Sequence, residues 1–416
     1  MRILYLCSDF GVPVYGHKGA SIHLRAMVQA FAALGHEVRI LSPAIDPPAH
    51  QDFTVPAVTP VSLVPHEASL AALRQLDRRL GALDSGHASR VAQEIRNLLY
   101  NQELARGADG LREFGADFVY ERYALFGFGG LELARGLAVP HLLEVNAPLC
   151  LEHERVRGLH LGDLARAIER RTWCDTSALL AVSEPLRARA LEIGASAERV
   201  HVLPNGVAAE RFATDAAAGE RCRTSLGLGA GPVIGFVGSL KAWHGTEVLL
   251  RAFTALRSRV PSAQLLVVGD GPTADALRRE AAARGIAAAV HFTGAVEHGA
   301  IPTLLAAMDV AVAPYLPADD FYFSPIKVYE YMAAGRPVVA SRLGEMAPLG
   351  AAGLLCAVEP GDSDSLAGGI EAVLAAPEAA AARAARARTW VGKERTWEAN
   401  ARRALALAAR GPAAAA

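Results

Sequence analysis

The segment from Ser324 to Gly335 carries the residues with the clearest potential for chemistry. Its pattern predicts a loop, a short helix with Pro325 in its first turn, a stop at Gly335, and then a strand. The free amides and dipole of a helix N-terminus favour anions such as phosphate, and Lys327 adds a positive charge in the first turn. Glu330, one turn further on, can accept hydrogen bonds from a sugar diol. A capped helix with a solvated lysine and glutamate is an equally good interpretation of these residues alone.

A second candidate is the loop Gly238 to Gly245, which follows an apolar strand and precedes a helix. Its Lys241 and His244 could meet the negative charge of a leaving group, because such charge must be balanced by donors that are already in place. The alternative is a solvated loop without chemistry.

Glycine turns mark three further places. Gly269 and Gly271 end another predicted strand, although this sequence alone predicts only a tight turn. The loop around Gly16 and Gly19 has glycines that let backbone amides approach a ligand at a helix start. This loop lacks the G-x-G-x-x-G pattern of dinucleotide-binding proteins, which argues against a dehydrogenase.

The cysteines and histidines show no ligand pattern. Five cysteines lie far apart in mostly apolar contexts, as expected of reduced thiols in a cytosolic protein. His153 and His160 are not at metal-binding spacing, so we expect no structural metal. The apolar start from Met1 to Cys7 is too short for a signal peptide and predicts a strand.

Length and composition limit the class of protein. A chain of 416 residues with 52% hydrophobic and 20% charged residues can bury two sizeable cores. Lysine and arginine total 42 against 43 acidic residues, so the net charge gives no reason to expect nucleic acid as the main partner.

Two series of alternating strands and helices must position these residues. The first series begins with a strand, helix and strand, and the region from 43 to 65 is expected to be irregular. Helical periodicity follows from 68 to 105. The remaining predicted elements of this series are strands over 118–120, 141–145 and 178–182 and a helix over 161–174.

The Ala- and Gly-rich stretch from 213 to 231 is the best candidate for a boundary between domains. We therefore predict an α/β protein with two Rossmann-like domains, 1–206 and 207–394, whose parallel sheets face an interdomain cleft. A helix over 395–410 is expected to pack back on the first domain. The second series has predicted strands over 233–237, 264–268, 290–292, 310–313 and 337–340.

The stretch from Phe321 to Ser341 resembles the donor-binding signature of the retaining glycosyltransferases of family 4, which have the GT-B fold. That signature has two glutamates separated by seven residues. The resemblance assigns Glu330, the second of them, to the ribose hydroxyls of the nucleotide. Tyr322 stands where the first would fall, and Asp319 or Asp320 could substitute for it.

Other segments resemble the same family in the same order. Ser239 and His244 occupy the places of an arginine and a lysine that hold the diphosphate, so Lys241 or Lys327 would supply the charge and His244 a hydrogen bond. Asn146 stands about where relatives often have a histidine near the reacting sugar. Ala208 replaces a frequent aspartate in the turn after Leu203.

The resemblance implies transfer of a sugar from a nucleotide-diphosphate sugar to an acceptor hydroxyl, with retention at the anomeric carbon. The expected catalytic residues are Lys327, His244, Lys241 and Asn146. The expected donor-binding residues are Glu330, Ser324, Pro325, Ile326, Gly238, Ser239, Gly269, Gly271, Phe292, Thr293 and Tyr322. The expected phosphate and acceptor loop comprises Gly16, Lys18, Gly19 and Ala20.

We expect no cofactor beyond a nucleotide sugar of the UDP or GDP type as co-substrate. A glycan, a lipid-linked sugar and a small metabolite all remain open as acceptors, as do the oligomeric state and a peripheral contact with the inner face of a membrane. We expect a cytoplasmic protein without a nucleic-acid partner. A nucleotide-sugar epimerase of the same fold and a non-catalytic sugar-nucleotide-binding protein are the two alternatives.

Overall fold

A computed structural model of the chain describes residues 1–16, 19–45, 58–62, 68, 71–72, 74–75, 78–79, 85–106, 111–213, 216–318 and 320–411. The chain divides into two compact units. The first unit comprises Met1–Pro204 together with Trp397–Ala416, and the second comprises Asn205–Thr396. Each unit is built on its own parallel sheet.

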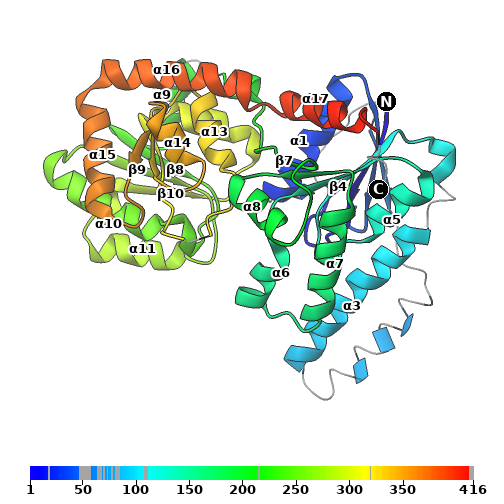
Figure 1. Ribbon diagram of the computed structural model, residues 1–416. Coiled ribbons are helices and arrows are strands. Elements are labelled where there is room, and N and C mark those ends of the chain that lie inside the picture. The colour runs from blue at the N-terminus through cyan, green and yellow to red at the C-terminus, as the bar shows by residue number, and fades with distance from the viewer. Residues whose placement is uncertain are drawn as a thin grey trace. The chain divides into compact units, whose positions relative to one another are not determined.

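The first unit has a seven-stranded sheet with the order β3-β2-β1-β4-β5-β6-β7. Its strands β4 and β7 are labelled in Figure 1. Its register places Cys7 of β1 beside Arg122 of β4, and Arg122 beside Glu144 of β5, so these strands end at one edge. The strands are β1 (Arg2–Cys7), β2 (Glu37–Ser42), β3 (Val58–Ser62), β4 (Phe118–Arg122), β5 (His141–Val145), β6 (Ala178–Ala181) and β7 (Val200–Val202).

Strand β3 corrects the expectation that residues 43 to 65 are irregular throughout. It pairs with β2 at the edge of the sheet and contains Pro60. A proline is tolerated on an edge strand because one side of that strand needs no ladder hydrogen bonds. Because of Pro60, β3 could not be recognised as a strand from the sequence.

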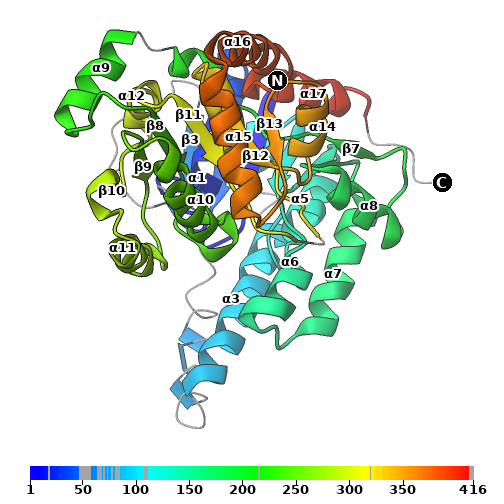
Figure 2. The same ribbon diagram turned by 90° about the vertical axis from the view of Figure 1, so that its left-hand side faces the viewer.

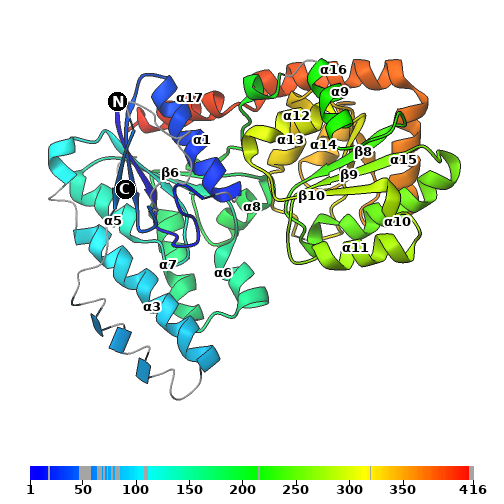
Figure 3. The same ribbon diagram turned by 180° about the vertical axis from the view of Figure 1, so that it is seen from behind.

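Helices cover both faces of this sheet. Tyr100 and Leu104 of one helix pack with Leu133 of another against β1 and β4. The helix that begins at Trp397 packs along α1 (Figure 3). The helices are α1 (Gly19–Ala33), α3 (Ser85–Arg106), α5 (Gly129–Leu137), α6 (Leu149–Glu152), α7 (Gly162–Asp175), α8 (Glu184–Glu192) and α17 (Trp397–Ala408).

The second unit has a six-stranded parallel sheet with the order β10-β9-β8-β11-β12-β13. The four inner strands are rich in apolar residues and are largely buried, as expected of a sheet covered on both faces, whereas the two edge strands are only partly buried. The strands are β8 (Val233–Val237), β9 (Gln264–Val268), β10 (Val290–Gly294), β11 (Val310–Ala313), β12 (Val338–Ser341) and β13 (Cys356–Val358).

Two hydrophobic cores lie on opposite faces of this sheet. One contains Phe253, Leu277 and Ile370, and its helices are α10 (Thr246–Arg259), α11 (Ala274–Ala283) and α15 (Ser363–Ala375), the last of which crosses β12 and β13 (Figure 2). The other core is covered by α9 (Ala216–Ser225), α12 (Ile301–Ala306), α13 (Ile326–Ala333), α14 (Met346–Ala351) and α16 (Pro377–Glu394).

Helix α9 lies within the stretch 213–231, the best candidate for a domain boundary in the sequence. Its alanines are strong helix formers, and Cys222 buries itself in the core of the second unit. The stretch is therefore part of that unit.

Candidate functional site

Helix α13 is the most deeply embedded part of the predicted site. Residues 328–333 are all buried, and the Tyr331 hydroxyl accepts a hydrogen bond from the Val237 amide at 2.8 Å and donates one to the Val237 carbonyl at 3.1 Å. These bonds tie the helix to the carboxyl end of β8. The chemistry-bearing residues of α13 thus stand on a rigid element.

The loop before α13 is fixed by the turn that opens the second unit. The Asn205 amide donates to the Ser324 hydroxyl at 2.9 Å, and the Asn205 side chain donates to the Ser324 carbonyl at 3.1 Å. Both residues are buried. Ser324 therefore positions the helix start, with Pro325 as its capping residue and Ile326 as its first helical residue.

Lys327 places a buried cation at the first turn of α13. Its stem is partly exposed, but its ammonium nitrogen is buried and makes no hydrogen bond within the described part of the chain. That nitrogen lies 4.4 Å from the centroid of the Phe236 ring and 5.2 Å from that of Tyr315. Burial lowers the pKa of Lys327 to about 7, and the nearby Glu330 charge opposes the shift.

His244 lies against the same two rings. Its imidazole is 5.5 Å from the Tyr315 ring and 6.1 Å from the Phe236 ring, centroid to centroid. Burial, followed by the Lys327 charge, lowers the pKa of His244 to about 3. The structure thus brings the predicted pair Lys327 and His244 together, and two cations so close together would repel each other.

The protonation of His244 follows from its hydrogen bond. Its Nδ1 contacts the Ser239 carbonyl, which can only accept, so Nδ1 carries the hydrogen. Neutral imidazole then has a lone pair at Nε2. His244 can therefore donate to a diphosphate through Nε2 only after it takes up a proton, which limits the role expected from the sequence.

Three predicted glycines allow the strand-end loops to touch. A β-carbon at Gly238 would lie 2.7 Å from the Lys327 Nζ, and one at Gly269 only 2.0 Å from the Gly238 carbonyl oxygen. One at Gly271 would lie 2.5 Å from the Leu240 carbonyl oxygen. The loops after β8 and β9 are joined by backbone hydrogen bonds, so these glycines are needed for close approach whether or not a ligand binds.

Glu330 is buried on α13 and has a partner that the sequence analysis missed. His298, in the short helix His298–Ala300 after β10, contacts the Glu330 Oε1 through its Nε2 at 2.8 Å. No motif links residues 298 and 330, and only the fold brings them together.

Other predicted residues of this unit have aromatic or solvent neighbours. Lys241 places its ammonium 4.6 Å from the Trp243 ring centroid. Tyr322 packs on Phe323 at 4.4 Å between centroids, and Asp320 is exposed. The alternative residue Asp319 lies outside the described ranges.

The predicted base-reading segment forms the end of β10. Phe292 is half-buried against the core, and the Arg278 guanidinium lies 4.6 Å from its ring centroid. The Thr293 hydroxyl donates to the Gly294 carbonyl at 2.8 Å. Arg278 is a second neighbour that the sequence analysis missed.

In the first unit, the predicted glycine loop leads into α1. A β-carbon at Gly16 would lie 2.6 Å from the Ser21 hydroxyl, whereas one at Gly19 would meet nothing within 4 Å. Arg25 donates to the carbonyls of Val14 and Gly16 and so holds the loop, and Ala20 lies in the first turn of α1. Lys18 is not among the described residues.

A buried polar cluster lies at the carboxyl edge of the first sheet. His23 Nε2 is 2.7 Å from a Glu144 carboxylate oxygen, and Arg122 lies 3.1 Å from His23 Nδ1. Despite burial, which acts to raise it, the pKa of Glu144 is lowered because His23 and Arg122 stabilise its charge. Asn146, two residues beyond, has a buried side-chain nitrogen without a hydrogen-bond partner among the described residues.

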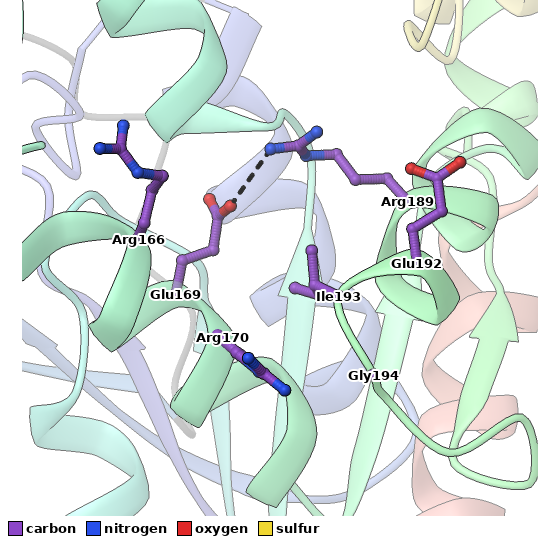
Figure 4. Close-up of a pocket in the computed structure, with 7 residues that line it drawn as sticks. All are labelled: Arg166, Glu169, Arg170, Arg189, Glu192, Ile193 and Gly194. Carbon is purple, nitrogen blue, oxygen red and sulfur yellow. Dashed lines mark ion pairs between the residues drawn. The ribbon is translucent and has the colours of Figure 1, made fainter. Parts of the chain in front are cut away.

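A pocket of about 300 Å³ lies between α7 and α8, and none of the predicted site residues lines it. Figure 4 shows the side chains around it. Its charges are largely matched, since Arg189 lies 3.7 Å from the Glu169 carboxylate and Arg166 bonds to Asp163 at 2.6 Å. The residues that line it are Arg166, Glu169, Arg170, Arg189, Glu192, Ile193 and Gly194.

Two kinds of feature are absent from the described residues. No three histidine, cysteine, aspartate or glutamate side chains among them gather closely enough to hold a metal ion. None of their helices combines the length and apolar character that crossing a bilayer requires.

Two family models match the chain. The glycosyl transferase 4-like domain matches residues 18–206, and the glycosyl transferases group 1 domain matches residues 231–376. Together they span most of the chain in the order of the two units. The chain therefore belongs to the group 1 glycosyl transferases and has the GT-B fold, which confirms the family and fold predicted from the sequence.

Individual relatives agree with this assignment. A GDP-mannose-dependent alpha-(1-6)-phosphatidylinositol monomannoside mannosyltransferase of Mycolicibacterium smegmatis is 35% identical over 57% of this chain, a match that spans 63% of that relative. Glycogen synthase of Mycobacterium tuberculosis is 29% identical over 93% of this chain and 89% of its own length. Anabaena HepE, solved with UDP and glucose, shares the fold with a TM-score of 0.73 and 19% identity over 99% of this chain and 100% of its own.

Proposed function

We propose that this protein transfers a sugar from a nucleotide-diphosphate sugar to an acceptor hydroxyl, with retention at the anomeric carbon. The observation that carries the proposal is the buried Lys327 ammonium, which has no hydrogen-bond partner within the described residues, one helical turn before the carboxylate of Glu330. An unpaired buried cation is costly to a fold, and its position in the first turn of α13 suits an anionic ligand. Retention is proposed from the resemblance to family 4.

In this proposal the Lys327 ammonium and the positive end of the α13 helix dipole bind the diphosphate and stabilise the charge that develops as the sugar leaves. The Ile326 and Val328 amides already donate to the Ser324 and Pro325 carbonyls, so they take no part. The low-polarity wall of Phe236 and Tyr315 strengthens the attraction, because charges interact more strongly away from water. The bound anion raises the proton affinity of His244. Once protonated, His244 donates a hydrogen bond from Nε2 to the diphosphate.

Glu330 would accept hydrogen bonds from the ribose hydroxyls, through the carboxylate oxygen that His298 does not contact. We propose a UDP- or GDP-type donor, since a relative is named for GDP-mannose and a neighbour of the same fold was solved with UDP. The acceptor would bind to the first unit, near Asn146 and the Gly16–Ala20 loop. A glycan, a lipid-linked sugar and a small metabolite all fit this description.

Replacement of Glu330 by alanine tests the assignment. We expect a donor KM at least about tenfold higher, because a hydrogen bond to a charged group contributes roughly 1.5–3 kcal/mol. Unchanged transfer kinetics at limiting donor would contradict the ribose role. Glu378→Ala, at an exposed position in the first turn of α16, provides a control for loss of negative charge.

Release of free nucleotide separates the proposed activity from its alternatives. With UDP-glucose or GDP-mannose as donor, a transferase releases UDP or GDP only when an acceptor is present, apart from slow hydrolysis. An epimerase converts the donor without releasing nucleotide, and a binding protein only rises in melting temperature. Proton NMR of the product would establish whether the anomeric configuration is retained.

We place this reaction in the cytoplasm. All five cysteines are free thiols, three of them buried, which suits a reducing compartment.

A further inference from the structure

The carboxylate of Glu330 is held by a residue from another loop. Its Oε1 lies 2.8 Å from the Nε2 of His298, and only 11% of the glutamate side chain is exposed. A carboxylate accepts, so the imidazole donates this hydrogen bond from Nε2. The contact joins α13 to the loop after β10.

His298 is itself fixed in place. It begins a one-turn helix, and its ring packs edge-on against Phe212 with 6.2 Å between the ring centroids. Its side chain is 27% exposed, which is enough for it to border a ligand at Glu330. The two contacts leave the imidazole little freedom to turn.

The two carboxylate oxygens of Glu330 have different surroundings, because only Oε1 contacts His298. The second oxygen of Glu330 makes no hydrogen bond within the described residues and is not fully buried. A carboxylate free to rotate would spread its orientations over several directions. One oxygen held by His298 aims the other along a single direction.

We propose that His298 is a positioning residue for nucleotide binding: it orients Glu330 so that the free oxygen meets the ribose 2′-hydroxyl. The inference rests on the proposed role of Glu330 in ribose binding. It extends that role to specificity, because a 2′-deoxyribonucleotide would leave the aimed oxygen without its hydrogen bond. The protein would therefore select ribonucleotide donors over thymidine-type donors.

Calorimetric titration of the full chain with UDP and GDP, and with their 2′-deoxy forms, tests the proposal without requiring an acceptor. The variants are His298→Phe, which keeps the ring packing on Phe212, and His298→Gln, whose amide can donate to Glu330. Glu330→Gln reports on the carboxylate itself. His201→Phe, in the first unit, is a matched control for loss of a histidine.

For the better-binding nucleotide, we expect the wild-type protein to prefer the ribose form over the deoxy form by about tenfold. His298→Phe should weaken binding of the ribose form about tenfold and reduce the preference to within about threefold, and His298→Gln should restore most of both. A purely structural role would weaken both nucleotides equally, so an unchanged preference in His298→Phe overturns the proposal.

Glu330→Gln separates the proposed role of His298 from that of Glu330. If Glu330→Gln weakens ribonucleotide binding and His298→Phe does not, the role of His298 is wrong while that of Glu330 stands. If neither variant changes affinity, the assignment of Glu330 to the ribose is wrong. If none of the nucleotides binds the wild-type protein, the proposed function falls with it.

Discussion

The ammonium of Lys327 fits against the backbone of Gly238, where a β-carbon would lie 2.7 Å from the nitrogen. Gly238 also has a φ of +146°, a conformation that other residues rarely adopt. The glycine at the end of β8 therefore makes room for the cation of α13. Two segments almost ninety residues apart in sequence define one binding position.

Gly238→Ala should displace the Lys327 ammonium and weaken binding of UDP or GDP at least about tenfold. It should also cost roughly 1 kcal/mol of stability through backbone strain. Gly285→Ala is the matched control, because Gly285 has a φ of +69° but open space around a β-carbon. Calorimetry should show weakened nucleotide binding only for Gly238→Ala; equal affinities in the two variants would refute the steric link.

Lys327→Met should stabilise the free protein at neutral and lower pH. The pKa of Lys327 is lowered from 10.5 to about 7, so the folded state binds fewer protons than the unfolded state between these values. The penalty of burying the charge is therefore fully present below about pH 7 and is relieved as the pH rises. We expect a gain of at least about 1 kcal/mol near pH 6 that shrinks towards pH 9. Melting temperatures across this range would test the prediction, and a constant difference would contradict it.

Nucleotide binding should take up a proton at Lys327. A bound diphosphate favours the ammonium form and raises the pKa of Lys327 from about 7, so affinity should fall as the pH rises from 7 to 9, by up to about tenfold per pH unit. Titrations in buffers of different ionisation enthalpy measure the uptake directly. In Lys327→Met the affinity should be lower and should lack this dependence. A wild-type affinity as flat as that of the variant would rule out the linkage.

Transfer should survive removal of divalent cations. In the proposed site the Lys327 ammonium and the α13 helix dipole already meet the diphosphate charge, so dialysis against EDTA should leave the rate within about twofold. Loss of activity that returns with magnesium or manganese would contradict this prediction. Lys327→Met should remain slow with or without added metal.

Much of the fold could be predicted from short apolar runs. Strands such as His141–Val145, Val233–Val237 and Gln264–Val268 lie within the predicted ranges, because strands buried on both faces are nearly continuous in hydrophobic residues. Strand β3 and helix α9 could not be predicted so easily. Pro60 is permitted only by the edge position of β3, and the glycines near α9 resemble a linker in composition.

The candidate site could be predicted only in its local parts. Lys327 and Glu330 share one short helix, so their spacing is visible in the sequence. His298 is 32 residues from Glu330, and Asn205 is 119 residues from Ser324, so only the packing of the sheet reveals these contacts. The contacts of Lys327 with Phe236 and Tyr315 are also revealed only by the fold. In the sequence, these two aromatic residues cannot be told from other apolar residues in or near strands.

The return of α17 to the first unit affects how the chain folds during synthesis. The His23 ring packs on Trp397 with 4.8 Å between ring centroids, and the Asn400 side chain donates to the Pro204 carbonyl at 2.7 Å. Most of the first unit is synthesised before the second unit. The first unit can complete its fold only after α17, which is translated after the second unit, has been made. The second unit, continuous from Asn205 to Thr396, can complete its fold earlier. Translation that stops before Trp397 would thus leave the earlier-made half incomplete and the later-made half intact.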